Sequence, residues 1–284
     1  MKILVTGATG KTGGELVKLL AAKGHLVRAA TRNPSQGKTV FPQGTEAVQF
    51  DFERPDTFAP ALLEIDKVFL IARPGDNRSD QVAMPLIDEA RKASVRHIVN
   101  LTAMGVEKDE NFMLRRLEKH VEASGIAFTH LRPNWFMQNF NEGPMYADIH
   151  RTGALHLPAA DARVSFIDIR DIAAVASAAL TQPHHEGVAY TLTGGEALTH
   201  FQVTQKISRV AGKTISYVPL SEEMAISGLA RAGVEEGLIQ RWTDFYRKIR
   251  AGFCEPISDD VERVLGRPPI MFDRYAEAHA AVWR

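Results

Sequence analysis

A glycine-rich turn directly follows the first apolar run of the chain, and it constrains the fold more than any other feature. The run Lys2–Thr6 is short and rich in β-branched residues, which predicts a buried strand. Gly7, Gly10 and Gly13 then stand three residues apart, and leucines at helical spacing follow over Glu15–Lys23. Strand, glycine turn and helix in this order predict the first βα junction of a dinucleotide-binding domain.

Each glycine of such a turn has its own physical role. Gly7 permits the tight turn, Gly10 lets the backbone approach a pyrophosphate, and Gly13 lets the helix pack close to the strand. The N-terminus of the helix then presents N–H groups to the anion. The alternative is a plain glycine-rich turn, which the place of the motif at the first strand–helix junction disfavours. We therefore predict cofactor contacts along the turn, at Gly7, Thr9, Gly10, Lys11, Thr12 and Gly13.

The end of the second predicted strand, His25–Thr31, indicates which dinucleotide binds. An acidic residue about twenty positions past the turn meets a free ribose 2′-hydroxyl, whereas Arg meets a 2′-phosphate. The stretch Ala29–Pro34 contains no carboxylate, and it contains Arg32. Its guanidinium offers paired planar donors to phosphate, so the sequence favours NADP(H) over NAD, with Lys38 as a second cation nearby. The alternative is that Arg32 is a solvated loop residue.

Two residues after the third predicted strand, Ala47–Phe50, suit the adenine ring. Asp51 offers a carboxylate to the exocyclic amine, and Phe52 offers a ring for stacking. Asp51 suits a helix cap equally well, because Pro55 opens a predicted helix shortly after it.

Predicted strands and helices alternate as far as Pro133, which indicates a parallel sheet covered on both faces. The fold class is thus α/β, a Rossmann-type doubly wound sheet with a smaller, mainly helical C-terminal lobe. We expect residues 1–133 to form the NADP-binding domain, completed by about 163–193. Residues 134–162 and 194–284 form the substrate-binding lobe, in which the segment up to Asp161 is expected to be irregular.

The composition excludes several classes of protein. The 284 residues carry a formal net charge of +0, which argues against a nucleic-acid partner. No apolar run is long enough for a transmembrane helix, and Ile3–Val5 is too short for the core of a signal peptide. Cys254 is the single cysteine, so no disulfide forms within the chain. We expect a cytoplasmic protein, a monomer or a homodimer.

Several segments resemble the atypical short-chain dehydrogenases of the NmrA-like group. They are the turn Thr6–Gly13, the segment Arg32–Pro34, the segment Ser165–Ala173, and Leu131–Asn139 with its more specific Arg-Pro-x-x-Phe-Met-x-Asn pattern. The resemblance covers nearly the whole chain and is closest to bacterial NADPH-dependent quinone, azo-dye and triphenylmethane reductases. It implies a Rossmann domain that holds NADPH and a small lobe that closes over a substrate cleft.

One departure from typical short-chain dehydrogenases bears on the mechanism. Those enzymes use Tyr and Lys four residues apart to move a proton, but none of the five tyrosines here has Lys four residues on. With Glu118 in the usual helix register, the two positions are Glu110 and Leu114. Two functions remain open: a reductase that passes hydride to a planar electron-poor acceptor, and a non-catalytic NADP(H) sensor. The size of the chain and its lack of an interaction tail favour the reductase, with catalytic residues unknown.

The substrate is expected beyond the carboxyl ends of the strands. Ala72 and Thr102 would flank the cofactor there, and Asn134 belongs to the segment that the resemblance places beside the nicotinamide. Arg73 is a further cofactor or substrate contact, either a clamp for an anionic substrate or a solvated charge. The remaining candidates for a small aromatic substrate are Met104, Trp135, Phe136, Met137 and Tyr146. Of these, Trp135, Phe136 and Met137, together with Phe140, alternatively pack the lobe against the sheet.

Other polar and aromatic residues have ordinary structural explanations. Asp168 and Asp171 begin a predicted helix, where carboxylates cap N–H groups. The adjacent His184 and His185 lie in a loop and do not form a metal site, so no metal is predicted. Aromatic residues at helical spacing over Trp242–Ile249 suit a core or a dimer contact.

Overall fold

The computed structural model describes residues 1–36, 40–73 and 78–284, and the chain forms two compact units. Lys38 lies outside the described residues. The first unit joins Met1–Pro133, Ile169–Leu192 and Asp260–Arg267. The second joins Asn134–Asp168, Thr193–Asp259 and Pro268–Arg284.

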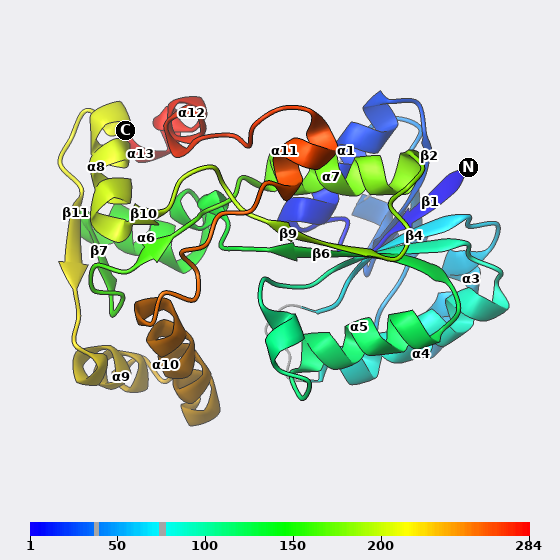
Figure 1. Cartoon of the computed structure of the whole chain (residues 1–284), viewed down its shortest axis with the longest axis horizontal. Helices are drawn as coiled ribbons and strands as arrows, with labels where there is room; N and C mark the ends of the chain where they lie inside the picture. The colour runs from blue at the N-terminus through cyan, green and yellow to red at the C-terminus, as the bar shows by residue number, and fades with distance from the viewer. Residues whose placement is uncertain (37–39, 74–77) are drawn as a thin grey trace. The chain divides into compact units, whose positions relative to one another are not determined.

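A seven-stranded parallel sheet forms the centre of the first unit (Figure 1). Its strand order is β3-β2-β1-β4-β5-β6-β9, so the order reverses between β1 and β4. Nearly every residue of the central strands is buried, because helices cover both faces and leave no side for solvent. The strands are β1 (Lys2–Val5), β2 (Leu26–Thr31), β3 (Glu46–Gln49), β4 (Lys67–Ile71), β5 (His97–Leu101), β6 (Ala127–Pro133) and β9 (Val188–Leu192).

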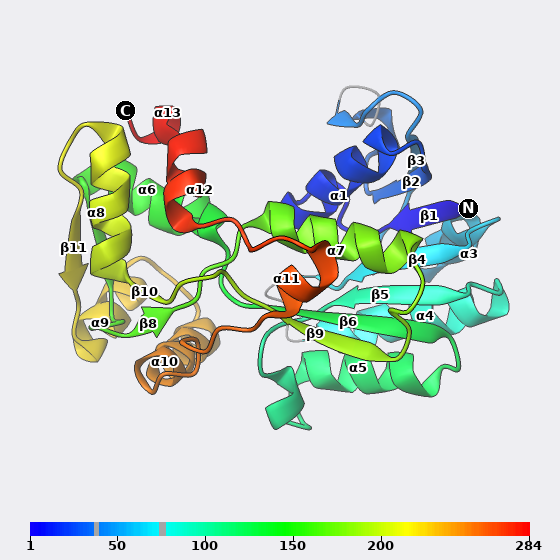
Figure 2. The ribbon, with the colours of Figure 1, turned by 45° about the horizontal axis from the view of Figure 1, so that its top comes forward.

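Helices lie on both sides of this sheet, as Figure 2 shows for α1 and α7 on one face and α4 and α5 on the other. On the second face Leu4, Leu70 and Ile98 pack against Leu86 and Leu117 in one apolar cluster. The helices are α1 (Lys11–Ala22), α3 (Phe58–Leu62), α4 (Ser79–Lys92), α5 (Met113–Ala123), α7 (Ile169–Thr181) and α11 (Asp260–Leu265), with short 3-10 turns η1 (Pro34–Gln36), η2 (Pro55–Thr57) and η3 (Val106–Lys108).

The doubly wound parallel sheet confirms the predicted fold class. Because β1 and β4 are neighbours at the reversal of strand order, the turn after β1 and the loop after β4 lie side by side at one edge of the sheet, the edge formed by the carboxyl ends of the strands. The Thr6 hydroxyl joins them: it accepts from the Ile71 N–H at 2.7 Å and lies 3.2 Å from the Ile71 carbonyl. In folds of this class that edge is where dinucleotides bind.

Helix α11 belongs to the first unit, although it lies within residues 194–284, which were expected to form the lobe. A carboxylate oxygen of Asp260 accepts from the Thr191 N–H at 2.7 Å, on strand β9. The guanidinium of Arg263 lies over the Tyr190 ring, 5.8 Å from its centroid. These contacts join segments about seventy residues apart, which no local pattern reveals.

The second unit is mainly helical, with two small sheets, β11 beside β7 and β10 beside β8. Phe140, Phe166 and Phe272 meet edge-to-face in its core. Its elements are η4 (Met137–Phe140), α6 (Gly143–Thr152), β7 (Ala154–Leu157), β8 (Arg163–Val164), β10 (Leu198–Thr199), α8 (His200–Ala211), β11 (Ser216–Pro219), α9 (Glu222–Arg231), α10 (Glu236–Arg250), α12 (Phe272–Ala278) and α13 (Ala280–Trp283).

The prediction of an irregular segment up to Asp161 is wrong, because α6 and β7 form there. Proline in the first turn of α6 and Gly153 in the left-handed region at its end (φ 70°) are ordinary helix signals. Residues 163–168, expected to complete the NADP-binding domain, belong to the second unit, where β8 pairs with β10 and does not join the large sheet. None of the helices in the described ranges combines the length and apolarity needed to cross a bilayer.

Candidate functional site

The glycine turn between β1 and α1 folds back tightly on itself. The Gly10 N–H donates to the Gly7 carbonyl at 2.9 Å, and Gly7 has a φ of +60°, which favours glycine. A Cβ on Gly13 would lie 2.7 Å from the carbonyl carbon of Gly7 and closer still to its oxygen. The start of α1 therefore packs on the turn at a distance that only glycine allows.

The N-terminus of α1 is open to a ligand. The first N–H groups of any α-helix lack intrahelical acceptors. Gly10, the N-cap residue of α1, supplies no side-chain hydrogen bond to them, and the first turn carries no acidic residue. Gly7, Thr9 and Gly10 are exposed, whereas Thr12 is buried beneath them. An exposed turn at a positive helix end fits the pyrophosphate of a dinucleotide.

Arg32 stands where the 2′-phosphate prediction requires a cation, immediately after β2. Its side chain is exposed, and within the described ranges no hydrogen bond or ion pair engages its guanidinium. Its backbone carbonyl accepts from the Gln49 amide at 3.1 Å, which fixes the loop against β3. An anchored backbone with an unengaged guanidinium suits phosphate binding, and this role stays a prediction.

Asp51 does not cap the helix that follows it, because the N-cap of η2 is Arg54; it stabilises its own turn instead. Its carboxylate accepts from the Glu53 N–H at 3.1 Å, and its carbonyl accepts from the Arg54 N–H at 2.9 Å. Phe52 is half-buried and meets Phe50 edge-to-face, with ring centroids 4.9 Å apart. Their contacts with adenine stay predictions.

Ala72 and Arg73 follow β4 at the edge where the strand order reverses. Ala72 is buried, and Arg73 forms an ion pair of 2.9 Å with Glu53, whose carboxylate also pairs with Arg78 at 3.3 Å. A clamp by Arg73 would thus compete with Glu53 for the same guanidinium.

The predicted substrate residues of the second unit differ in their surroundings. Asn134 is buried, and its amide donates to the Ser165 hydroxyl at 2.7 Å and to the Cys254 carbonyl at 2.8 Å. Trp135 is half-buried and stacks on Phe245, with ring centroids 5.1 Å apart and planes 3° from parallel. Among the other candidates, Phe136 and Tyr146 are half-buried, whereas Met137 is in the core.

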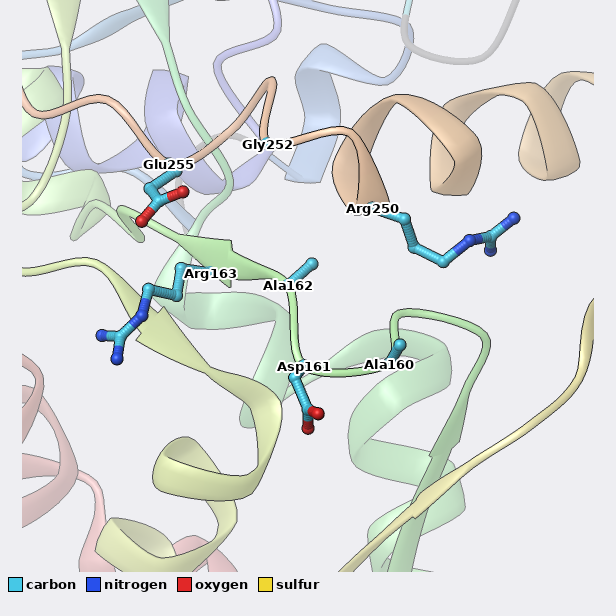
Figure 3. A pocket seen from close by; sticks show the side chains of 7 residues that line it. All are labelled: Ala160, Asp161, Ala162, Arg163, Arg250, Gly252 and Glu255. Atoms are coloured by element: carbon cyan, nitrogen blue, oxygen red, sulfur yellow. The ribbon is translucent and has the colours of Figure 1, made fainter.

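A pocket of about 430 Å³ opens in the second unit (Figure 3). Both of its arginines are engaged: Arg250 donates to the Pro158 carbonyl at 2.5 Å, and Arg163 donates to the Ala197 carbonyl at 3.1 Å. None of the predicted substrate residues lines it; the lining residues are Ala160, Asp161, Ala162, Arg163, Arg250, Gly252 and Glu255.

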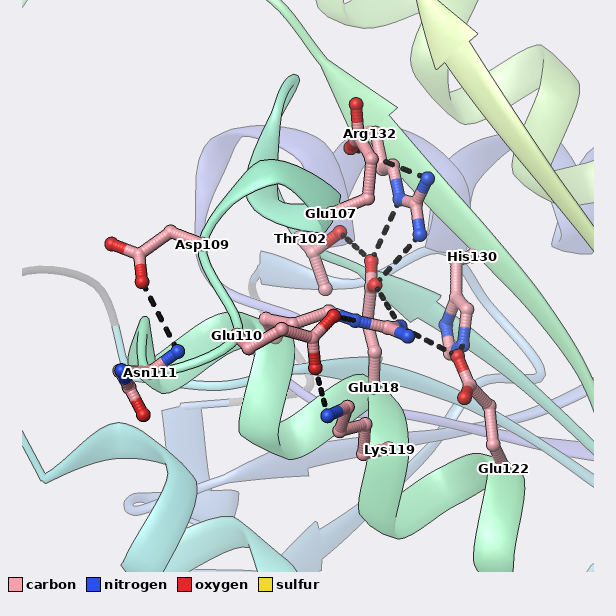
Figure 4. Close-up of polar contacts among 11 residues, drawn as sticks. Thr102, Glu107, Asp109, Glu110, Asn111, Glu118, Lys119, Glu122, His130 and Arg132 are labelled. Carbon is pink, nitrogen blue, oxygen red and sulfur yellow. Dashed lines mark hydrogen bonds and ion pairs between the residues drawn. The ribbon is translucent and has the colours of Figure 1, made fainter.

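Thr102, which follows β5, belongs to a polar network in the first unit that sequence reasoning missed (Figure 4). The carboxylate of Glu118 on α5 is fully buried. Its Oε1 accepts from the Thr102 hydroxyl at 2.8 Å and from Arg132 Nε at 3.0 Å, and its Oε2 accepts from Arg132 Nη2 at 2.8 Å. Burial alone raises the pKa of Glu118, but hydrogen bonds from Arg132 and Thr102 and nearby positive charge hold it below its ordinary value.

Arg115 extends this network along α5. Its Nη1 lies 3.0 Å from Glu118 Oε2 and 2.7 Å from Glu122 Oε1. His130 lies 3.4 Å from Glu122, and burial lowers the pKa of its imidazole. Glu118, Glu122 and His130 bring possible ligand atoms within 4.8 Å of one another, but the Arg115 guanidinium already bridges the two carboxylates. The cluster is therefore built as an ion-pair network.

The signals for this network were weak in the sequence. Arg115 and Glu118 have the i,i+3 spacing of an ion pair on a helix, and such pairs usually lie on the solvent-exposed face of the helix. Met104, the other residue predicted after β5, is half-buried, and its N–H donates to the Pro133 carbonyl at 2.9 Å.

Comparison with known proteins gives a consistent family. The profile of the NmrA-like family matches residues 1–241. The chain is 35% identical to an NAD(P)H azoreductase of Xenophilus azovorans, over 99% of both chains. It is also 35% identical to a (4-alkanoyl-5-oxo-2,5-dihydrofuran-3-yl)methyl phosphate reductase of Streptomyces griseus, over 98% of both chains. The crystal structure of the Citrobacter sp. triphenylmethane reductase complexed with NADP(H) superposes with a TM-score of 0.83 at 25% identity, covering 99% of this chain and 100% of that one.

Proposed function

Because the chain belongs to the NmrA-like family, we propose that it is an NADPH-dependent reductase for planar, electron-poor acceptors such as quinones and azo compounds. The observation that carries this proposal is the glycine turn. Its exposed residues, the lack of a side-chain cap from Gly10 and the close approach at Gly13 together fit a dinucleotide pyrophosphate.

The choice of NADPH rests on Arg32. Its exposed guanidinium, at the end of β2, fits the dianionic 2′-phosphate, and no carboxylate follows that strand to receive a free 2′-hydroxyl. Names of the relatives support the same cofactor, since one is an NAD(P)H azoreductase and another is complexed with NADP(H).

Hydride transfer in this chain proceeds without a tyrosine–lysine dyad. No tyrosine has Lys four residues on, and Tyr190, Tyr246 and Tyr275 are buried within their own units. NADPH, when bound, supplies the hydride from its nicotinamide ring. The chain holds the cofactor at the sheet edge, and the reduced acceptor takes its proton from water. Catalysis is then mainly positioning, which suits acceptors that need only hydride.

The acceptor class follows from this chemistry and from the relatives. Their names give an azo reductase, a reductase of a conjugated furanone and a dye reductase. All three kinds of substrate contain a conjugated, electron-poor centre that can accept hydride. Simple ketones and alcohols are disfavoured, because their reactions need a positioned proton donor or acceptor.

The test follows NADPH absorbance with a quinone, an azo dye and an aldehyde in parallel. Turnover of the first two without the aldehyde is expected. Tight NADPH binding with no turnover of any acceptor would overturn the reductase and favour the alternative, an NADP(H) sensor.

The cofactor assignment has its own test, with a matched control. Arg32→Ala should weaken NADPH binding about tenfold or more and leave NADH binding nearly unchanged, because a charge-assisted hydrogen bond contributes about 1.5–3 kcal/mol. Arg96→Ala removes an exposed arginine that pairs with Asp66, and should change neither. Equal losses for both cofactors in Arg32→Ala would refute the 2′-phosphate contact.

A further inference from the structure

We propose that the Thr102 hydroxyl is a hydrogen-bond acceptor for the carboxamide N–H of the nicotinamide, and that Glu118 fixes it in that role. Thr102 is then a positioning residue for the cofactor and does not donate a proton to the substrate. The proposal rests on the proposed function, because it requires NADPH at the sheet edge.

The proton of the Thr102 hydroxyl is committed inside the protein. Its oxygen lies 2.8 Å from the Glu118 carboxylate and 3.4 Å from the Leu131 carbonyl, and both of these groups can only accept. The shorter contact to a charged acceptor is the stronger. Thr102 is largely buried, and what its hydroxyl has left for a ligand that reaches it is an oxygen lone pair, which accepts a hydrogen bond and donates none.

Glu118 can only accept the hydrogen bond from Thr102 and cannot donate one to it. It has no exposed surface, and its two oxygens receive hydrogen bonds from Thr102, Arg132 and Arg115. A carboxylate that accepts several charged donors stays ionised, so it does not donate a proton back to Thr102. Arg132 also pairs with Glu107 at 3.3 Å, which holds its guanidinium from the other side.

The place of Thr102 in the sheet matches the nicotinamide half of a dinucleotide. Doubly wound sheets consist of two mononucleotide-binding halves, and the ligand crosses the crevice where the strand order reverses. Here the glycine turn and Arg32 lie on the half formed by β1, β2 and β3. Thr102 follows β5 on the other half, and its N–H donates to the Leu131 carbonyl at 2.8 Å, which anchors it beside β6.

The carboxamide of nicotinamide carries an NH₂ group, which needs acceptors. A hydroxyl whose own proton is engaged is selective for such a donor, whereas a free hydroxyl would accept or donate equally well. Glu118 thus acts through Thr102 and determines which side of the hydroxyl the cofactor meets.

The test uses a cofactor analogue that lacks this donor. In the reduced form of 3-acetylpyridine adenine dinucleotide phosphate, a methyl group replaces the NH₂. Dissociation constants of NADPH and of the analogue are measured by calorimetry without an acceptor, for the wild type and for Thr102→Val, Thr102→Ser and Thr45→Val. Thr45 lies just before β3, at the amino ends of the strands, whereas Thr102 lies at their carboxyl ends. Its hydroxyl has no hydrogen-bond partner among the described residues, so Thr45→Val is the matched control.

The wild type, Thr102→Ser and Thr45→Val should bind NADPH about two- to tenfold more tightly than the analogue, the range expected for one hydrogen bond. Thr102→Val should bind the two equally. Circular dichroism checks that each variant is folded. Thr102→Val leaves Glu118 with its two arginine partners, so it does not strand a buried charge as a Glu118 variant would.

Three results would overturn the proposal. The wild type could bind NADPH and the analogue equally tightly, or Thr102→Val could prefer NADPH over the analogue as strongly as the wild type does. In the third, Thr102→Val keeps this preference but has a lower kcat at saturating NADPH. The last result would make Thr102 a proton donor. A selective effect of Arg32→Ala on NADPH together with any of these would leave the proposed function standing, which separates the two failures.

Discussion

Replacing Gly13 by alanine should uncouple the glycine turn from α1. The new Cβ would lie 2.7 Å from the carbonyl carbon of Gly7 and 3.1 Å from the Ala8 nitrogen, both backbone atoms. Carbon atoms in contact normally stand about 3.5–4.0 Å apart, so the start of α1 must move away from the turn by about 1 Å. Forced overpacking of this kind costs about 1–3 kcal/mol in the free energy of unfolding.

The same movement should reduce cofactor affinity. Displacing the α1 N–H groups by about 1 Å weakens at least one charge-assisted hydrogen bond to the pyrophosphate, which raises the NADPH dissociation constant by about tenfold or more. Urea unfolding and calorimetric NADPH binding measure the two effects. Gly14→Ala is the control, because its Cβ would meet only the Ala8 carbonyl oxygen, at 3.2 Å, and alanine gains about 1 kcal/mol of helix propensity. A Gly13→Ala protein that binds NADPH like the wild type, or a Gly14→Ala protein that is equally impaired, would refute the reasoning.

Three further predictions concern side chains whose surroundings the structure defines. Burial among Phe140, Phe166 and Tyr217 lowers the pKa of His200 from 6.5 to about 4, so the folded state loses stability as the pH falls between these values, by roughly 3 kcal/mol. In His200→Phe the free energy of unfolding should therefore fall less steeply between pH 6.5 and pH 4. Some slope remains, because burial also lowers the pKa of His97 to about 4. A slope equal to that of the wild type would contradict the prediction for His200. Burial also raises the pKa of the Cys254 thiol to about 11, so iodoacetamide at pH 8 should label it only in urea, and rapid labelling of the native protein would count against this. Arg73→Ala should raise KM about two- to fivefold for a sulfonated azo dye and leave KM for a neutral quinone unchanged, and equal changes would dismiss the clamp.

The sequence predicts those parts of this protein whose signals are local. The glycine turn and the break at Pro133 each depend on a few neighbouring residues, and the structure has them where the pattern indicates. Helix α6 was missed although its proline and Gly153 are local signals, because the aromatic and glycine content around it suggested a loop. Helix α11 was placed in the wrong unit for a different reason: the Asp260–Thr191 contact that holds it depends on the tertiary structure.

Glu118 shows most clearly why the rest of the site could not be predicted. In the segment Leu117–Glu122 it is one of several charged residues on a helix, where a carboxylate usually faces solvent. It is buried because β5 and β6 bring Thr102 and Arg132, sixteen and fourteen residues away in sequence, against the same face of α5. An ionised carboxylate at such a depth is tolerated only when all of these donors surround it. The donors come from separate segments of the chain, so none of them forms a sequence motif with Glu118. The polar network after β5 is therefore a property of the assembled sheet, whereas the glycine turn follows from the order of residues in one short stretch.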